Sequence, residues 1–349
     1  MSIFHIVPGT DDAANGMAVV ARLLAKEQGD AEVVDLKSVI HGNIVSALTG
    51  RSGVSPLQGK GGFDFFKKRR DAASPSQCDE PVEGKCEDVE EVWVHGMWLP
   101  KEWLACWRTI RSGKRLVRMT HGSLSPLYLK YQSPVKKWLV GPIERFLLRR
   151  SARIVATCEA EKEWIENYLG KRCPVVEVTD VKRFFQLERE FGIDGNIEAA
   201  SPKGERDSLH ILYLGRRHPL KGVEYLEKAV AELNSNPVNP VNHVQNSSLH
   251  VSTCSARLKI VSSTFGEELE KVWEWCDVLV LPTLSENFGL VIAEALERGK
   301  CVITTDGAPA WGNGNTYGGR LVYLKGYRDG TAEMRVRLLK DAIEKLRAQ

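Results

Sequence analysis

Short apolar runs alternate with amphipathic segments along the first half of the chain. Residues in these runs are mostly β-branched or aromatic, whereas the segments between them place apolar residues every three to four positions, as in a helix. The runs lie at 3–8, 31–35, 89–96, 115–120 and 153–157, and the clearest helical pattern lies at 17–26. Strands separated by helices are typical of parallel sheets, so we expect an α/β unit here.

The second half repeats this alternation after a polar stretch at 186–208. Strands are predicted at 209–215, 258–262, 277–282 and 301–305, and helices at 221–234, 267–276 and 289–298. A last helical pattern covers 331–349. We therefore predict α/β domains at 1–185 and 207–330, followed by a helix that packs back across both.

Two segments interrupt the pattern. Residues 50–88 are rich in Gly, Ser, Pro and charge and are too polar to form a core, so they predict a mobile insertion. Residues 234–248 are rich in Asn, Pro and Ser, which is typical of a loop.

Composition narrows the class of protein. The chain has 349 residues, 43% of them hydrophobic, and a net charge of +3, which suits a globular protein and does not favour nucleic acid as a partner. No apolar run is long enough to span a membrane, and the start of the chain lacks the features of a signal peptide. Its 8 cysteines include no Cys-x-x-Cys pair, so free thiols in the cytoplasm and no zinc site are expected.

Positive charge is concentrated at 128–153, where seven Lys and Arg residues face only Glu144 and aromatic residues lie between the cations. A basic, aromatic amphipathic helix can lie on anionic lipid, which would put the protein on the inner face of the cell membrane. The same pattern also fits an ordinary helix with a buried apolar face and solvated charges.

The richest candidate chemistry lies at 281–312. Glu286 follows a predicted strand, Gly289 stands where a helix begins, and Glu294 comes eight residues after Glu286. Free N–H groups at the start of that helix could bind an anion. The backbone positions concerned are Asn287, Phe288, Gly289 and Leu290. The ordinary alternative is a capped helix with two solvated glutamates.

Two further candidates also follow predicted strands. Arg216 and Lys221 lie in a Gly-bearing turn, where a guanidinium and an ammonium suit a diphosphate. His121 follows the strand at 115–120 and could hydrogen-bond a substrate. Solvated basic residues and a packed histidine are the alternatives. Asn15-Gly16 separates the first strand and helix without a full G-x-G-x-x-G motif, so a dinucleotide site is only weakly indicated.

Together these motifs resemble the retaining family 4 (group 1) glycosyltransferases of the GT-B fold. Residues 285–295 match that family's S-E-x-F-G-x-x-x-x-E-A stretch, 215–222 match its G-R-x-x-x-x-K-G, and THGSLSP stands at the position of its N-terminal histidine loop. The resemblance covers 1–30, 89–180 and 209–312. It implies two Rossmann-like α/β domains that face each other across a cleft.

The resemblance also implies a role for each residue. Arg216 and Lys221 would neutralise the diphosphate of a UDP- or GDP-linked sugar, and Glu294 would bind its ribose. Glu286 and His121 would be the catalytic residues at the transferred sugar. Gly16 would approach the phosphates, although Asn15-Gly16 replaces the family's paired glycines. No Asp-x-Asp pair occurs, so neither a metal nor a separate cofactor is expected.

The implied reaction is sugar transfer with retention to a glycan or lipid-linked acceptor, in cell-envelope polysaccharide or lipopolysaccharide synthesis. A nucleotide-sugar 2-epimerase shares the GT-B fold and is one alternative. A non-catalytic protein that binds a sugar nucleotide is another. Isotope exchange at the sugar carbon without an acceptor would distinguish the epimerase.

Overall fold

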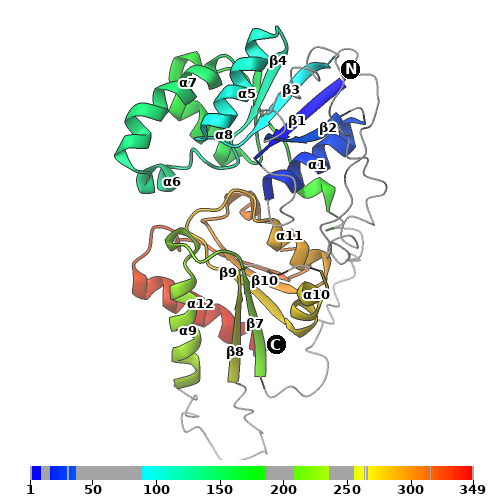
Figure 1. Ribbon diagram of the computed structural model, residues 1–349. Helices are drawn as coiled ribbons and strands as arrows, with labels where there is room; N and C mark the ends of the chain where they lie inside the picture. Colours follow the sequence, from blue (N-terminus) through cyan, green and yellow to red (C-terminus); the bar gives the residue numbers. More distant parts are fainter. Residues whose placement is uncertain are drawn as a thin grey trace, which may run out of the picture. The chain divides into compact units, whose positions relative to one another are not determined.

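The computed structural model describes residues 2–8, 16–29, 31–36, 89–185, 187, 208–235, 255–262, 264, 266–314 and 316–347. These residues form two compact units, one within 1–184 and the other within 185–349 (Figure 1). The predicted insertion at 50–88 and the predicted loop from residue 236 to 248 lie outside the described residues.

The first unit is built on a six-stranded parallel sheet in the order β2-β1-β3-β4-β5-β6. Its strands are β1 Ser2–Val7, β2 Ala31–Asp35, β3 Val89–His95, β4 Arg115–Met119, β5 Arg153–Ala156 and β6 Val176–Val178. Its helices are α1 Gly16–Gln28, α5 Pro100–Arg111, α6 Pro126–Tyr131, α7 Gly141–Arg149 and α8 Glu159–Leu169, with a π-helix at Lys136–Val140 and short 3-10 turns at Gly170–Arg172 and Val181–Phe184.

Strands β3 and β4 lie in the middle of this sheet and are buried almost throughout. Strands covered by helices on both faces read as continuous apolar runs, which explains VWVH and LVRM. Helix α1 packs on β1 and β2, α5 on β3 and β4, and α8 on β5 and β6. The buried apolar residues of the unit gather in separate clusters, one around β1, β3 and α5 and another around β5 and α8.

The second unit has a five-stranded parallel sheet in the order β11-β10-β9-β7-β8. Its strands are β7 Ser208–Leu214, β8 Ser255–Val261, β9 Val278–Leu281, β10 Cys301–Thr305 and β11 Leu321–Leu324. Its helices are α9 Val223–Ser235, α10 Gly266–Trp275, α11 Leu290–Glu297 and α12 Ala332–Arg347, with 3-10 turns at Pro219–Lys221 and Pro309–Trp311.

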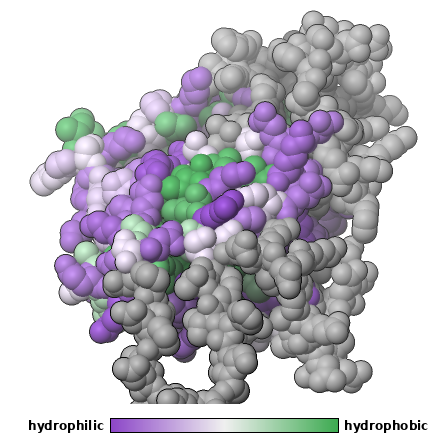
Figure 2. All heavy atoms as spheres, turned by 90° about the horizontal axis from the view of Figure 1, so that it is seen from below, coloured by the Kyte–Doolittle hydropathy of each residue, from purple (hydrophilic) through white to green (hydrophobic). Residues whose placement is uncertain are grey.

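The face of the molecule seen from below is mostly hydrophilic, with apolar residues gathered near its centre (Figure 2).

The final helix α12 packs on α9 within the second unit. Arg335 of α12 donates to the Tyr225 hydroxyl of α9 at 2.9 Å. That this helix also reaches the first unit stays a prediction.

Two sequence predictions need correction. The predicted helix at 221–234 begins only at Val223, because Gly222 has a left-handed φ of 63° and separates it from the turn that contains Lys221. The basic segment 128–153 is not one helix: it breaks at Gln132–Ser133. It continues through the π-helix into α7, where Pro142 has no N–H for the regular helical bond.

Candidate functional site

The second unit gathers its predicted site residues at one edge of the sheet. Strands β7, β9 and β10 are neighbours and parallel, so their carboxyl ends share that edge. The loops that follow them are 215–222, 282–289 and 306–312. In open parallel sheets this edge is where ligands bind.

Backbone hydrogen bonds connect these loops. Leu284 N donates to Leu220 O at 2.8 Å, which joins the β9 loop to the β7 loop. Glu286 N donates to Gly307 O at 2.8 Å, which joins it to the β10 loop. The bond to Gly307 sets the backbone position of the catalytic candidate Glu286.

Glycines let the loops approach this closely. A Cβ atom at Gly222 would lie 2.2 Å from Pro282 O, and one at Gly307 would lie 2.0 Å from Thr283 O. Carbon and oxygen cannot approach that closely without a bond, so any other residue would push the loops apart. The KG of the first motif and the DG after β10 are therefore needed for loop packing.

Lys221 and Glu286 form an ion pair, with Lys221 Nζ donating to Glu286 Oε2 at 2.5 Å. Each side chain is 21% exposed, so the pair is accessible from solvent. The other carboxylate oxygen, Oε1, accepts from Asn287 N at 3.2 Å. An ammonium has three donors, so Lys221 keeps two for an anion while it holds Glu286.

Helix α11 begins next to this pair. Its N-cap is Gly289 at φ 71°, a left-handed conformation that favours glycine. Leu290 is the first residue of the helix. The side chain of Phe288 is buried, and its carbonyl accepts from Trp311 Nε1 at 2.5 Å. Phe288 therefore contributes only backbone to any ligand, while its ring holds the loop in place.

The remaining predicted residues of this unit differ in exposure. Arg216 is exposed, and its carbonyl accepts from the Tyr213 hydroxyl at 2.9 Å. Glu294 lies within α11 and is only 5% exposed. The exposed guanidinium of Arg216 can therefore contact a ligand that arrives from solvent, whereas little of the Glu294 side chain is accessible to one.

The first unit holds His121 just after β4. Its φ of 49° is unusual for a residue with a side chain. Glu161 of α8 holds both neighbours in the chain: its Oε1 accepts from Thr120 Oγ1 at 2.7 Å and from Gly122 N at 2.6 Å. The buried Glu161 carboxylate thus stabilises a backbone turn that the histidine would not adopt by itself.

His121 is one end of a row of imidazoles that sequence reasoning missed. Its Nε2 lies 2.8 Å from His95 Nδ1, and His95 Nε2 lies 2.9 Å from His5 Nδ1. Burial lowers the pKa of His5 to about 4 and that of His121 to about 3. Burial also lowers the pKa of His95 well below its usual value, so all three rings are neutral near pH 7. The signal available in the sequence was a histidine inside each of two buried strands.

A buried charge cluster beneath α5 was also missed. Arg118 of β4 pairs with Glu144 of α7 at 3.4 Å, and both side chains are fully buried. Arg118 also donates to Gly96 O at 2.7 Å. Burial raises the pKa of the neighbouring Glu102 to about 7, although Arg118 opposes that shift. These groups connect helices α5 and α7 to the centre of the sheet.

Gly16 is the first residue of α1, but residues 9–15 ahead of it lie outside the described residues. Its predicted approach to phosphates therefore stays a prediction. Within the described ranges, no group of three or more His, Cys, Asp and Glu residues could hold a metal ion. In the same part of the chain, no helix is both long and apolar enough to cross a bilayer.

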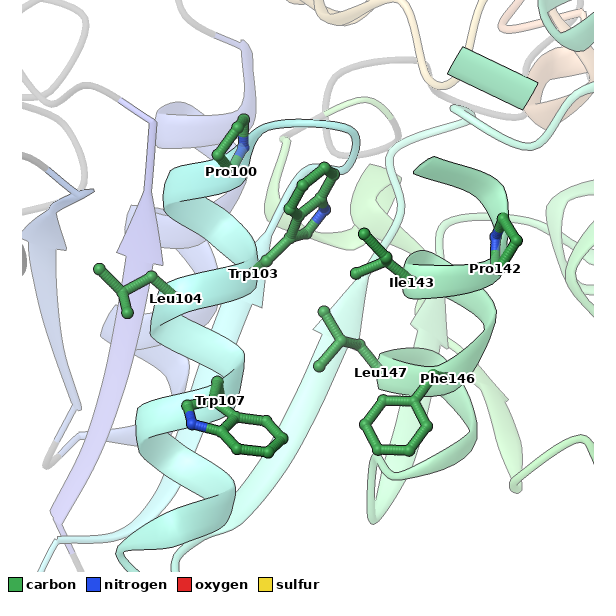
Figure 3. A pocket seen from close by; sticks show the side chains of 8 residues that line it. All are labelled: Pro100, Trp103, Leu104, Trp107, Pro142, Ile143, Phe146 and Leu147. Carbon is green, nitrogen blue, oxygen red and sulfur yellow. The ribbon is translucent and has the colours of Figure 1, made fainter. Parts of the chain in front are cut away.

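A second surface feature lies between α5 and α7. It is an apolar cavity of about 580 Å³, into which side chains of both helices point (Figure 3). Trp107 is 45% exposed and Phe146 is 44% exposed at its rim. It is lined by Pro100, Trp103, Leu104, Trp107, Pro142, Ile143, Phe146 and Leu147.

Each unit matches a family of glycosyltransferases. Residues 208–341 match the family described as "Glycosyl transferases group 1", and residues 87–179 match the "Glycosyl transferase 4-like domain". The second match contains His121, and the first contains the Lys221–Glu286 pair.

Curated relatives are similar over part of the chain. One is a D-inositol 3-phosphate glycosyltransferase of Paenarthrobacter aurescens, 28% identical over 181 residues, which are 47% of this chain and 43% of that protein. The Streptomyces avermitilis enzyme of the same name is 32% identical over 180 residues, 46% of this chain and 38% of its own length. The chain thus spans less than half the length of these relatives.

Solved structures match over nearly the whole chain. Sucrose-phosphate synthase from Thermosynechococcus elongatus has a TM-score of 0.54 at 16% identity and covers 100% of this chain and 90% of its own. HepE from Anabaena, in complex with UDP, has a TM-score of 0.52 at 14% identity and covers 98% of this chain and 91% of its own. The predicted α/β class and GT-B fold are confirmed.

Proposed function

Since both units match glycosyltransferase families, we propose that this chain is a retaining, family 4 type glycosyltransferase that uses a nucleotide-sugar donor. The observation that carries the proposal is the Lys221–Glu286 pair, held at the carboxyl edge of the sheet beside the start of α11. In this pair the Lys221 ammonium, which suits a phosphate, lies 2.5 Å from the Glu286 carboxylate, which suits sugar hydroxyls.

The donor diphosphate gains negative charge as the sugar departs, so fixed positive groups must meet it. Lys221 and Arg216 supply that charge, and the N–H groups at the start of α11 add to it. Glu286, already held through both oxygens, accepts from a hydroxyl of the transferred sugar. By the same family resemblance, Glu294 binds the ribose of the donor and His121 contacts a hydroxyl of the transferred sugar.

Retention and independence from metal belong to the same proposal. The absence of an Asp-x-Asp pair and the presence of two cations favour a reaction in which protein groups neutralise the leaving diphosphate. Attack then occurs on the face from which the diphosphate departs, with a phosphate oxygen accepting the acceptor's proton. EDTA should leave turnover intact, whereas loss restored by Mn²⁺ or Mg²⁺ would contradict the metal-free part.

The acceptor proposed is a glycan or lipid-linked sugar at an anionic membrane, as in cell-envelope polysaccharide synthesis. Support comes from the apolar cavity between α5 and α7, which is large enough for hydrocarbon. The carboxylates of these two helices, Glu102 and Glu144, are buried, so their exposed charges are all positive. In the π-helix that leads into α7, Trp138 is 83% exposed and Leu139 is 69% exposed.

Liposome binding tests the membrane part. The variant replaces four cations of the basic segment by Gln: Lys136, Lys137, Arg149 and Arg150. The matched control replaces four exposed cations of the second unit: Lys228, Lys271, Lys325 and Arg337. We expect sedimentation with anionic vesicles to fall in the variant only, and salt to mimic the loss. Equal binding by all three proteins would mean that the charges of this segment are simply solvated and do not contact lipid.

Donor identity and reaction are tested together. UDP- and GDP-sugars are screened by thermal shift, and the stabilising donor is then incubated with glycan, lipid-linked and inositol phosphate acceptors. NMR of the product reads the anomeric configuration, and retention is expected. An inverted product would contradict the retaining mechanism. Isotope exchange without acceptor would favour a 2-epimerase, and tight binding without hydrolysis or transfer would favour a non-catalytic protein.

A further inference from the structure

The row of imidazoles spans three neighbouring strands of the first sheet. His5 lies on β1, His95 ends β3, and His121 follows β4. Successive ring centroids are 5.2 and 5.1 Å apart. Gln28, the last residue of α1, closes the inner end with its Oε1 2.8 Å from His5 Nε2.

Neutral imidazole has one N–H and one lone pair, so it donates at one nitrogen and accepts at the other. His95 uses both nitrogens within the row. If it donates towards His5, it must accept from His121, and the reverse also holds. The hydrogen bonds of the row therefore share one direction, and the group at its end decides which.

Gln28 is that group. Its amide oxygen can only accept, so His5 donates from Nε2 and accepts at Nδ1. His95 then donates from Nε2 to His5, and His121 donates from Nε2 to His95. The lone pair of His121 Nδ1 is left at the outer end of the row.

We propose that Gln28, His5 and His95 are positioning residues that hold His121 as its Nε2–H tautomer, so that its Nδ1 accepts a hydrogen bond from a ligand hydroxyl. That the hydroxyl belongs to a sugar rests on the proposed function, whereas the tautomer does not. The charged groups nearest the row are Arg118 on β4 and Glu161 on α8, the latter bonded to the residues on either side of His121. Arg118 and the other two rings disfavour a cation within the row, so His121 serves as an acceptor rather than an acid.

Nitrogen NMR of protein with ¹⁵N-labelled histidine reads the tautomer directly. We expect His121, assigned by comparison with His121→Gln, to carry its proton on Nε2. Gln28→Glu keeps an obligate acceptor and should leave the spectrum of His121 unchanged. Gln28→Met removes the acceptor and should give a mixture of tautomers. Glu27→Met, one residue earlier in α1, removes an exposed ion pair with Arg183 but no acceptor of the row; it is the control, and the tautomer of His121 should be that of the wild type. A wild-type His121 protonated on Nδ1 would overturn the proposal.

Kinetics provide the second readout. His95→Phe and Gln28→Met should lower kcat, by about tenfold or more for His95→Phe, with little change in donor KM, because the wrong tautomer fails at the reacting sugar. If His95→Phe lowers kcat by this amount but leaves the His121 spectrum unchanged, the positioning role is overturned. A wild-type protein that shows the expected tautomer but transfers no sugar would instead refute the proposed function alone.

Discussion

The two units hold their candidate residues in place by different means. In the first unit, side chains hold side chains: His121 depends on His95, and its turn depends on the Glu161 carboxylate. In the second, backbone bonds and glycines pack the loops, and Lys221 meets Glu286 only at the surface of that arrangement. Substitutions in the first unit should therefore cost stability and function together, whereas those at the second unit's pair should affect function alone.

The largest expected effect is that of Arg118→Leu. It leaves the buried carboxylate of Glu144 without its cation, at a cost of about 3–5 kcal/mol in the free energy of unfolding. Arg115→Leu is the matched control on the same strand, because the Arg115 side chain is 59% exposed and its pair with Glu91 should contribute below about 1 kcal/mol. Urea unfolding measures both, and similar losses in the two variants would contradict the difference between buried and exposed pairs.

Acid should destabilise the first unit through its histidines. The folded-state pKa of His5 is lowered to about 4, so below the unfolded value of 6.5 the unfolded chain binds protons that the folded chain does not. Stability is therefore present above pH 6.5 and lost as the pH falls towards 4, by about 1.4 kcal/mol per pH unit for each such histidine.

Glu102 changes the pH dependence of stability in the opposite direction from the histidines: it stabilises the folded state as the pH falls. Its pKa is raised to about 7, so the folded state keeps a proton that the unfolded state loses above 4.5. The three histidines lose about 1 kcal/mol each between pH 6.5 and 5.5 and Glu102 offsets about 1 kcal/mol, which leaves a net loss in the free energy of unfolding of about 2 kcal/mol. Unfolding curves at several pH values test this, and His5→Phe should reduce the slope. Unchanged stability over that range would show that the row does not stay neutral.

Arg216→Ala and Lys221→Ala should each weaken donor use by about 1.5–3 kcal/mol, the value of a charged hydrogen bond. Melting temperatures should barely move, because Arg216 is exposed and the Lys221 pair is solvent-accessible. Steady-state kinetics are measured beside melting curves. An unaltered kcat/KM in a folded variant would remove that residue from the phosphate site.

The smallest expected difference, between two glycine variants, separates loop packing from backbone conformation. Gly222 and Gly113 both have a positive φ, 63° and 72°, but a Cβ would meet Pro282 O at 2.2 Å at Gly222 and nothing within 4 Å at Gly113. Alanine at either site costs about 1 kcal/mol for the left-handed backbone, and Gly222→Ala should cost about 1–2 kcal/mol more. If urea unfolding gives the two alanine variants equal losses in the free energy of unfolding, the loops of the second unit rearrange around the added Cβ at little cost.

The sequence by itself determined what depends on neighbouring residues. The predicted limits of the strands at 31–35 and 301–305 agree with β2 and β10, because alternating apolar and β-branched residues act within a few positions. The paired glutamates and the Lys-Gly turn were also readable, since each motif lies within one loop and the helix that follows. The short edge strand β11 was missed, because its four residues, two buried and two half-buried, carry too little pattern.

Tertiary structure alone decided which distant residues meet. His5 and His95 are 90 positions apart, and Lys221 and Glu286 are 65 apart. Nothing local marks such pairs, because their contact depends on strand order and on which strand ends share an edge. Burial also came only with the fold, and it is burial that turns three ordinary histidines into neutral rings and Glu102 into a carboxyl with a pKa of about 7.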